Sequence, residues 1–141
     1  TVMNANATLV RRETEKSVEE VIARLLAVSA GTGFLIHNEG KMEMANTFGE
    51  HGVEVAEGFD LYMIQICNPE KASVSLQKNH ERAALIPKFI TVFSQDGKTQ
   101  VRLLRLEAGL IEDMIGDKEF ATSSAKNYDA IIGLVDKALA A

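Results

Sequence analysis

The stretch FITVFSQDGKTQVRLLRL, residues 89–106, decides the fold of this 141-residue chain. Aromatic and β-branched residues alternate from Phe89 to Phe93, as they do in a β-strand whose successive side chains point to opposite faces. The pair Asp96-Gly97 is typical of the tight turn between antiparallel strands, and residues 101–106 return as a second apolar run. The stretch therefore predicts a β-hairpin, and with it a mainly antiparallel sheet.

The apolar run upstream of the hairpin predicts another strand. It extends from Phe59 to Cys67 and is bounded by Gly58 and Pro69, so we expect a strand that is buried on both faces and central in the sheet. Asn68 is a favourable cap for a following helix, because its side chain can accept a hydrogen bond from a free amide of the first turn. Pro69 would occupy the first helical position, where its missing amide hydrogen costs no hydrogen bond.

The N-terminal part predicts a strand, a helix and a second strand. Residues 8–13 form the first strand. Ser17 and Glu20 have the spacing of a capping box, and apolar residues recur at helical spacing from Val18 to Leu26. Gly31 and Gly33 end this helix, and residues 34–36 begin the next strand.

The remaining segments differ in how clearly they can be interpreted. Glycines interrupt residues 37–58, whose pattern fits either a short helix near Ala45 or an edge strand. Further on, residues 108–115 predict a short helix, and the apolar spacing from Tyr128 to Leu139 predicts a longer helix that docks on the sheet. The chain is thus expected to form a single α+β domain over residues 1–141, with helices packed on the sheet in the order β-α-β-sheet-α.

Composition argues against several classes of protein. Hydrophobic residues make up 46% and charged residues 25% of the chain, which is typical of a globular protein rather than a disordered one. The formal net charge of −5 argues against nucleic acid as a partner, because nucleic-acid binders carry a basic excess or stripe. No apolar run approaches the roughly 20 residues that a membrane-spanning helix needs. The chain begins at Thr1 rather than Met, so a cytoplasmic location is favoured only slightly over export after cleavage of a leader.

Several short motifs resemble the family known as domain of unknown function 302. The motifs are Ile66-Cys67-Asn68-Pro69 followed by Ala72 and Leu76, then Leu85-Ile86-Pro87, then Val92 and Asp96-Gly97-Lys98. This resemblance covers most of the chain and implies a TATA-binding-protein-like α+β fold, often found as a homodimer, with no agreed activity. Many relatives carry a second cysteine just after the proline, where this chain has Lys88, so a two-cysteine site does not carry over.

The single cysteine, Cys67, is the first candidate for chemistry. Because the chain has only one cysteine, an intramolecular disulfide and a zinc site built from several cysteines are excluded. Cys67 ends a predicted strand just before a predicted helix start, where backbone amides and the helix dipole favour the thiolate. The alternative is a small apolar side chain at the buried end of a strand. No histidine is close to it in sequence, so a base for thiol catalysis would have to come from His37, His51 or His80 through the fold.

Asn68 and Pro69 are candidates for a ligand site together with Cys67 and Lys88. A carboxylate or phosphate could lie against the free amides of the predicted helix start, with Lys71 or Lys88 supplying positive charge. Simple helix capping explains Asn68 and Pro69 without any ligand.

A soft-metal site is a second hypothesis. His37, Met42, Met44 and His51 combine imidazole and thioether groups, which suit Cu(I) or haem. Their spacing matches no metal-binding motif, and methionines commonly fill irregular cores. The sequence therefore identifies no metal ligand and leaves any cofactor unknown.

Basic residues also follow the hairpin. Lys88, Lys98, Arg102 and Arg105 would form a basic patch if they shared a face, or would protect an exposed strand edge from uncontrolled pairing.

The sequence thus predicts a module that binds a small anionic or sulfur-containing ligand, or senses redox state through Cys67, and that forms a homodimer. Two alternatives stay open. One is a thiol-dependent enzyme acting on a small sulfur-containing or carbonyl substrate, and the other is a soft-metal or haem-binding protein.

Overall fold

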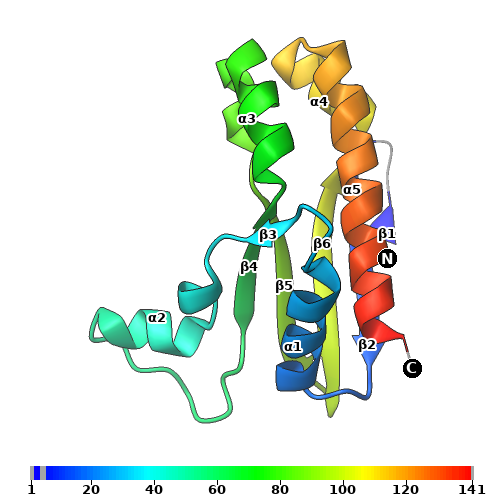
Figure 1. The fold of residues 1–141 in the computed structure, drawn as a ribbon. Coiled ribbons are helices and arrows are strands. Elements are labelled where there is room, and N and C mark those ends of the chain that lie inside the picture. The colour runs from blue at the N-terminus through cyan, green and yellow to red at the C-terminus, as the bar shows by residue number, and fades with distance from the viewer. Residues whose placement is uncertain (1, 4–5, 141) are drawn as a thin grey trace.

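The computed structural model describes residues 2–3 and 6–140. In this part of the chain, six strands form one sheet in the order β1-β2-β6-β5-β4-β3, and every neighbouring pair is antiparallel. The predicted α+β class with a mainly antiparallel sheet is confirmed. Figure 1 shows the strands β1 (Val2–Met3), β2 (Ala7–Thr14), β3 (Leu35–Ile36), β4 (Tyr62–Cys67), β5 (Lys88–Gln95) and β6 (Lys98–Leu106).

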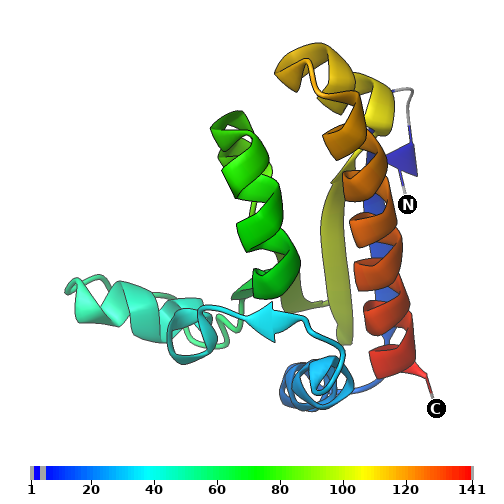
Figure 2. The ribbon, with the colours of Figure 1, turned by 45° about the horizontal axis from the view of Figure 1, so that its top comes forward.

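Two long helices cover one face of this sheet. The core between them and the strands is built from aliphatic residues such as Val21, Ile90 and Ile131, each no more than 1% exposed. Figures 1 and 2 show α1 and α5 over this face, while α3 stands apart from α5. The helices are α1 (Val18–Ser29), α2 (Met44–Glu50), α3 (Pro69–Lys78), α4 (Ala108–Ile115) and α5 (Lys118–Leu139), with the short 3-10 turns η1 (Glu39–Lys41) and η2 (His80–Leu85).

The hairpin predicted from residues 89–106 is confirmed as β5 and β6. Its turn residues, Asp96 and Gly97, have φ angles of 55° and 77°. Positive φ at both central positions is what a type I′ turn requires, and the twist of this turn matches that of the flanking strands. The register follows directly, with Gln95 opposite Lys98.

The helices predicted from local signals are also confirmed. Ser17 caps α1, because its hydroxyl accepts a hydrogen bond from the amide of Glu20 at 3.1 Å. The stripe from Val18 to Leu25 is buried, as expected. The short helix α4 has the predicted extent, whereas α5 begins at Lys118, ten residues before the apolar spacing that predicted it, and buries Tyr128 and its apolar neighbours.

Within residues 37–58 the helical alternative is correct. This segment contains η1 and then α2, which begins at Met44. Both carboxylate oxygens of Glu43 cap α2, accepting hydrogen bonds from the amides of Ala45 and Asn46.

The prediction that residues 59–67 form a central strand buried on both faces is wrong. The strand begins at Tyr62 and lies second from the sheet edge, between β5 and the two-residue β3. Ile64 is fully buried, whereas its neighbour Met63 is 36% exposed. The reason is that helices cover only one face of the sheet, so an apolar run buries only alternate residues.

The opposite face of the sheet, here called the outer face, carries exposed apolar side chains. Leu104 on β6 is 56% exposed, Phe89 on β5 is 45% exposed, and Met63 on β4 belongs to the same face. Polar groups accompany them, since Arg102 donates to the side chain of Gln100, which in turn donates to Glu13.

The basic residues of the hairpin do not form one patch. Lys88 and Arg105 lie on the helix-covered face, where both approach the ring of Tyr128. Arg102 stacks over Phe93 on the outer face, and Lys98 pairs with Glu13 at the hairpin end. Both strands are interior to the sheet, so protection of an edge does not explain these charges either.

A buried ion pair joins the segment after α3 to the start of α5. The guanidinium of Arg82, which is 4% exposed, donates to both carboxylate oxygens of Asp117 at 2.7 and 3.1 Å. It also donates to Ser75 on α3 and lies over the ring of Phe120. These bonds lower the pKa of Asp117 far below its usual range. No residue of α3 itself is buried, and this pair is the buried polar contact that ties its C-terminal end to α5.

We expect Arg82→Met to lower the melting temperature by at least several degrees, because it leaves the carboxylate of Asp117 without its guanidinium partner. Lys78→Met is the matched control, since it breaks the neighbouring exposed pair between Lys78 and Glu119, and exposed pairs contribute little. Thermal unfolding followed by circular dichroism measures both variants. If both variants lowered the melting temperature equally, the role assigned to the buried pair would be contradicted.

Candidate functional site

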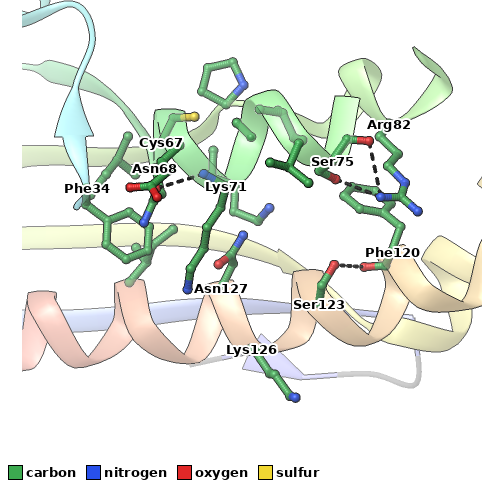
Figure 3. Close-up of a pocket in the computed structure, with 18 of the residues that line it drawn as sticks. Phe34, Cys67, Asn68, Lys71, Ser75, Arg82, Phe120, Ser123, Lys126 and Asn127 are labelled. Carbon is green, nitrogen blue, oxygen red and sulfur yellow. Dashed lines mark hydrogen bonds between the residues drawn. The ribbon is translucent and has the colours of Figure 1, made fainter. Parts of the chain in front are cut away.

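A cavity of about 470 Å³ lies between α3 and α5. We call it the α3–α5 cleft. The end of β4 and the start of β5 contribute Ile66, Cys67 and Lys88 to its lining. Figure 3 shows α3 on one side of the cleft and α5, with Phe120, Ser123 and Asn127, on the other. Phe34, from the loop before β3, closes one end, and Arg82 lies at the other.

The cleft concentrates positive charge in an otherwise acidic chain. Its lining has five basic residues and two acidic ones, whereas the whole chain has a net charge of −5. Arg82 and Lys78 are neutralised by Asp117 and Glu119. Among the described residues, no ion pair engages Lys71, Lys88 or Lys126. In Figure 3 Lys71 extends from α3 across the cleft toward α5, whereas the Lys126 side chain points away from α3.

The start of α3 is shaped by its cap. The Asn68 side chain accepts a hydrogen bond from the amide of Lys71 at 3.2 Å, as predicted for a capping residue. Gly33 packs against this cap. Its φ is +93°, and a Cβ atom there would lie 2.9 Å from Asn68 Nδ2, so only glycine lets the Phe34 loop approach the cap closely.

The predicted anion cradle at the helix start has few donors left. Pro69 has no amide hydrogen, the amide of Lys71 is taken by the Asn68 side chain, and that of Ala72 donates to the Asn68 carbonyl at 2.8 Å. Of the three N–H groups in the first four residues of α3, only that of Glu70 lacks an intramolecular acceptor in the described part of the chain. Pro69 itself is exposed and does not line the cleft. Side-chain charge, rather than the helix terminus, must dominate any anion binding here.

Lys88 is the most unusual residue of the cleft. It begins β5 and is only 7% exposed, and its ammonium lies 4.6 Å from the centroid of the Tyr128 ring. In the described residues it has neither a carboxylate partner nor a hydrogen-bond acceptor. Burial therefore lowers the pKa of Lys88 to about 8, while the neighbouring Cys67 acts in the opposite direction.

Cys67 ends β4 beside Lys88 and is half-buried. Burial raises the pKa of its thiol, and the positive charge of Lys88 offsets this only in part. The direction is opposite to the one predicted from the helix start. The physical reason is that burial disfavours the thiolate, while the start of α3 has only the Glu70 amide free to stabilise it.

The candidate soft-metal residues differ in burial. Met42 is 6% exposed and packs in the hydrophobic core, while His37 and His51 are exposed. Over residues 2–3 and 6–140, no group of three or more His, Cys, Asp and Glu residues is arranged to hold a metal ion. His37, His51 and His80 also do not line the cleft, so none is placed there as a base for Cys67.

The contribution of α5 to the cleft was missed in the sequence. Ser123 and Asn127 lie four residues apart and are followed by Ile131 after four more, so they share one face of the helix. The available signal for this part of the cleft was that two polar residues continue the apolar stripe of the predicted helix. The sequence alone could not show that α3, about 50 residues earlier, lies opposite them.

The comparison with known families identifies the fold. The family model described as "Domain of unknown function DUF302" matches residues 10–138. The chain belongs to this family. The resemblance inferred from the motifs around Cys67 and the hairpin is thereby confirmed.

A solved structure has the same fold. It is described as the crystal structure of an uncharacterized conserved DUF302 protein from Bacillus stearothermophilus. The match has a TM-score of 0.74 at 17% identity and covers 92% of this chain and 97% of the other. At this identity the likeness concerns the fold alone. No match was found among curated proteins. None of the helices in the described residues has both the length and the apolar character needed to span a membrane.

Lys88→Met should raise the free energy of unfolding at pH 7 by up to about 3 kcal/mol, because methionine fills the site without a desolvated ammonium. The folded-state pKa of about 8 lies below the ordinary 10.5, so the penalty in the wild type is complete below pH 8. This penalty disappears as the pH rises from 8 through 10.5, because Lys88 is then uncharged in the folded protein. Urea denaturation at pH 7 and pH 10 should therefore show a gain that shrinks at the higher pH.

The control for this variant is Lys126→Met, which removes an exposed lysine of the same cleft and should change stability little at either pH. If Lys88→Met raised the free energy of unfolding equally at pH 7 and pH 10, the lowered pKa of Lys88 in the folded protein would be contradicted.

Proposed function

We propose that the protein binds a small organic monocarboxylate with an apolar body in the α3–α5 cleft, with Lys88 as the counter-ion. The observation that carries this proposal is a lysine that is 7% exposed, lines a cavity and has no carboxylate partner among the described residues. A buried charge without a partner is costly, and a bound anion would remove that cost.

The dimensions and lining of the cleft support a small molecule. A volume of about 470 Å³ lies within the range of small-ligand pockets. Phe34, Ile66, Phe120 and Ile131 supply apolar contacts, while Ser123 and Asn127 are candidates for orienting polar groups. This combination of an apolar body and a few convergent polar groups is typical of ligand sites.

Ligand binding is favoured over redox sensing through Cys67, because burial raises the pKa of the thiol and so slows its reaction at neutral pH. A thiol-dependent enzyme is a weaker candidate for the same reason and because the cleft lining contains no histidine.

We expect the probe 3-phenylpropanoate to bind the wild type more tightly than its neutral amide, 3-phenylpropanamide. Lys88→Met should weaken carboxylate binding by about tenfold or more, the effect of losing one charge-assisted hydrogen bond in a buried site. Carboxylate affinity should also fall as the pH rises through about 8, since Lys88 then loses its charge. Isothermal titration calorimetry measures all three effects.

Lys126→Met is the matched control, because this side chain points away from α3 and should contribute little to binding. Carboxylate and amide binding with the same affinity, or a Lys88→Met variant that binds as tightly as the wild type, would refute the proposal.

We also propose that a second copy of the chain covers the outer face. Leu104, Phe89 and Met63 form an exposed apolar surface over three adjacent strands, a feature that is uncommon on monomers and typical of interfaces. The same face carries Arg102 and Glu13, so a two-fold axis could place the arginine of one copy near the glutamate of the other.

Leu104→Glu should convert the dimer to a monomer, because it places a carboxylate in the apolar centre of the proposed interface. The control is Met114→Glu on α4, which replaces a side chain of similar exposure, 52% against 56%, away from that face. Light scattering coupled to size-exclusion chromatography gives the mass of each variant. A monomeric wild type, or a Leu104→Glu dimer, would contradict this interface.

A further inference from the structure

Lys88 has the surroundings of a nucleophilic amine as well as those of a counter-ion. Its backbone is fixed because β5 pairs with β4, with Lys88 opposite Ile66. Its side chain lies against the ring of Tyr128 and lines the cleft, so the amine has a defined position beside an accessible cavity. Surface lysines have neither property.

We propose that Lys88 forms a reversible imine with the carbonyl group of a small 2-oxo acid bound in the α3–α5 cleft. This inference rests on the proposed function, because it places the same carboxylate class in the same cleft and adds a covalent bond to it.

The amine is available for this reaction at neutral pH. With a pKa of about 8, roughly a tenth of Lys88 side chains are uncharged at pH 7, against fewer than about one in a thousand for an ordinary lysine. Desolvated lysines are the ones that act as Schiff-base nucleophiles in proteins. Because no carboxylate holds the ammonium in the described residues, no ion pair must break first.

The carboxylate of a 2-oxo acid has a separate partner. Once Lys88 reacts with the carbonyl, a second cation is needed for the carboxylate, and Lys71 extends across the cleft from α3. A simple ketone would form the imine without this contact. The pair of lysines therefore favours a carbonyl compound that also carries a carboxylate.

The reaction balances without any cofactor. The nitrogen lone pair of the uncharged Lys88 attacks the carbonyl carbon, and a proton moves from nitrogen to the carbonyl oxygen to give a carbinolamine. The oxygen then leaves as water together with the second amine hydrogen, and a C=N bond replaces C=O. Hydrolysis reverses each step, so the free 2-oxo acid and the amine are recovered.

The test uses the full chain, phenylpyruvate as the 2-oxo acid probe, and sodium cyanoborohydride, which reduces the imine to a stable secondary amine. Intact mass spectrometry should show one added group whose mass is that of the acid less one oxygen atom. Peptide mapping should place the group on Lys88 rather than on Lys71 or Lys126. An excess of 3-phenylpropanoate, which has no carbonyl, should suppress the labelling several-fold.

Two variants sharpen this experiment. Lys88→Arg keeps the positive charge but cannot form an imine, so it should lose the adduct while still binding 3-phenylpropanoate. Cys67→Ala should keep the adduct, because a thiol gives no product that survives as a reduced amine.

The outcomes separate the two proposals. Labelling spread over surface lysines, or no adduct although 3-phenylpropanoate binds in a Lys88-dependent way, would overturn the imine and leave the binding function in place. Failure of 3-phenylpropanoate to bind the wild type would overturn both. Since the mapping is done on the wild type, the test does not depend on the folding of any variant.

Discussion

The bidentate ion pair between Arg82 and Asp117 is the contact on which the shape of the molecule around the cleft depends. Strands β4 and β5 are neighbours in the sheet, and the chain between them leaves the sheet as α3 and returns through η2. No residue of α3 is fully buried in this excursion, so apolar packing holds α3 less firmly than it holds α5. Arg82 adds a polar attachment, since it reaches Ser75 on α3 and Asp117 at the start of α5. The cleft lies between the well-packed helix α5 and the more exposed helix α3, which this ion pair joins at one end.

The sequence was informative where the determinants are local. The hairpin follows from Asp96-Gly97 and the alternation before it, and the start of α1 follows from Ser17 and its hydrogen bond to the amide of Glu20. Each of these depends on residues only a few positions apart, which is why both could be predicted. The same applies to the cap formed by Asn68.

The sequence was misleading where the outcome depends on long-range packing. The run ending at Cys67 looks buried on both faces, but whether a strand has one or two covered faces depends on helices far away in the chain. The thiol of Cys67 was expected to be acidic, but the number of free amides at the start of α3 depends on details of the cap. Lys88 was predicted as a source of positive charge for a ligand, but its burial beside Tyr128 of α5 could not be predicted, because those two residues are 40 positions apart.

The modest attachment of α3 has a consequence for how the family could diversify. No residue of this helix is buried, so most substitutions outside Ser75, which bonds to the buried Arg82, would leave the folding equilibrium almost unchanged. The same helix supplies one entire side of the cleft. Under the proposed binding function, changes in ligand preference can accumulate on α3 at little cost to stability, while the sheet and Lys88 at the start of β5 stay as they are. If the proposed binding function holds, such a fold separates the part that keeps the protein folded from the part that selects its ligand.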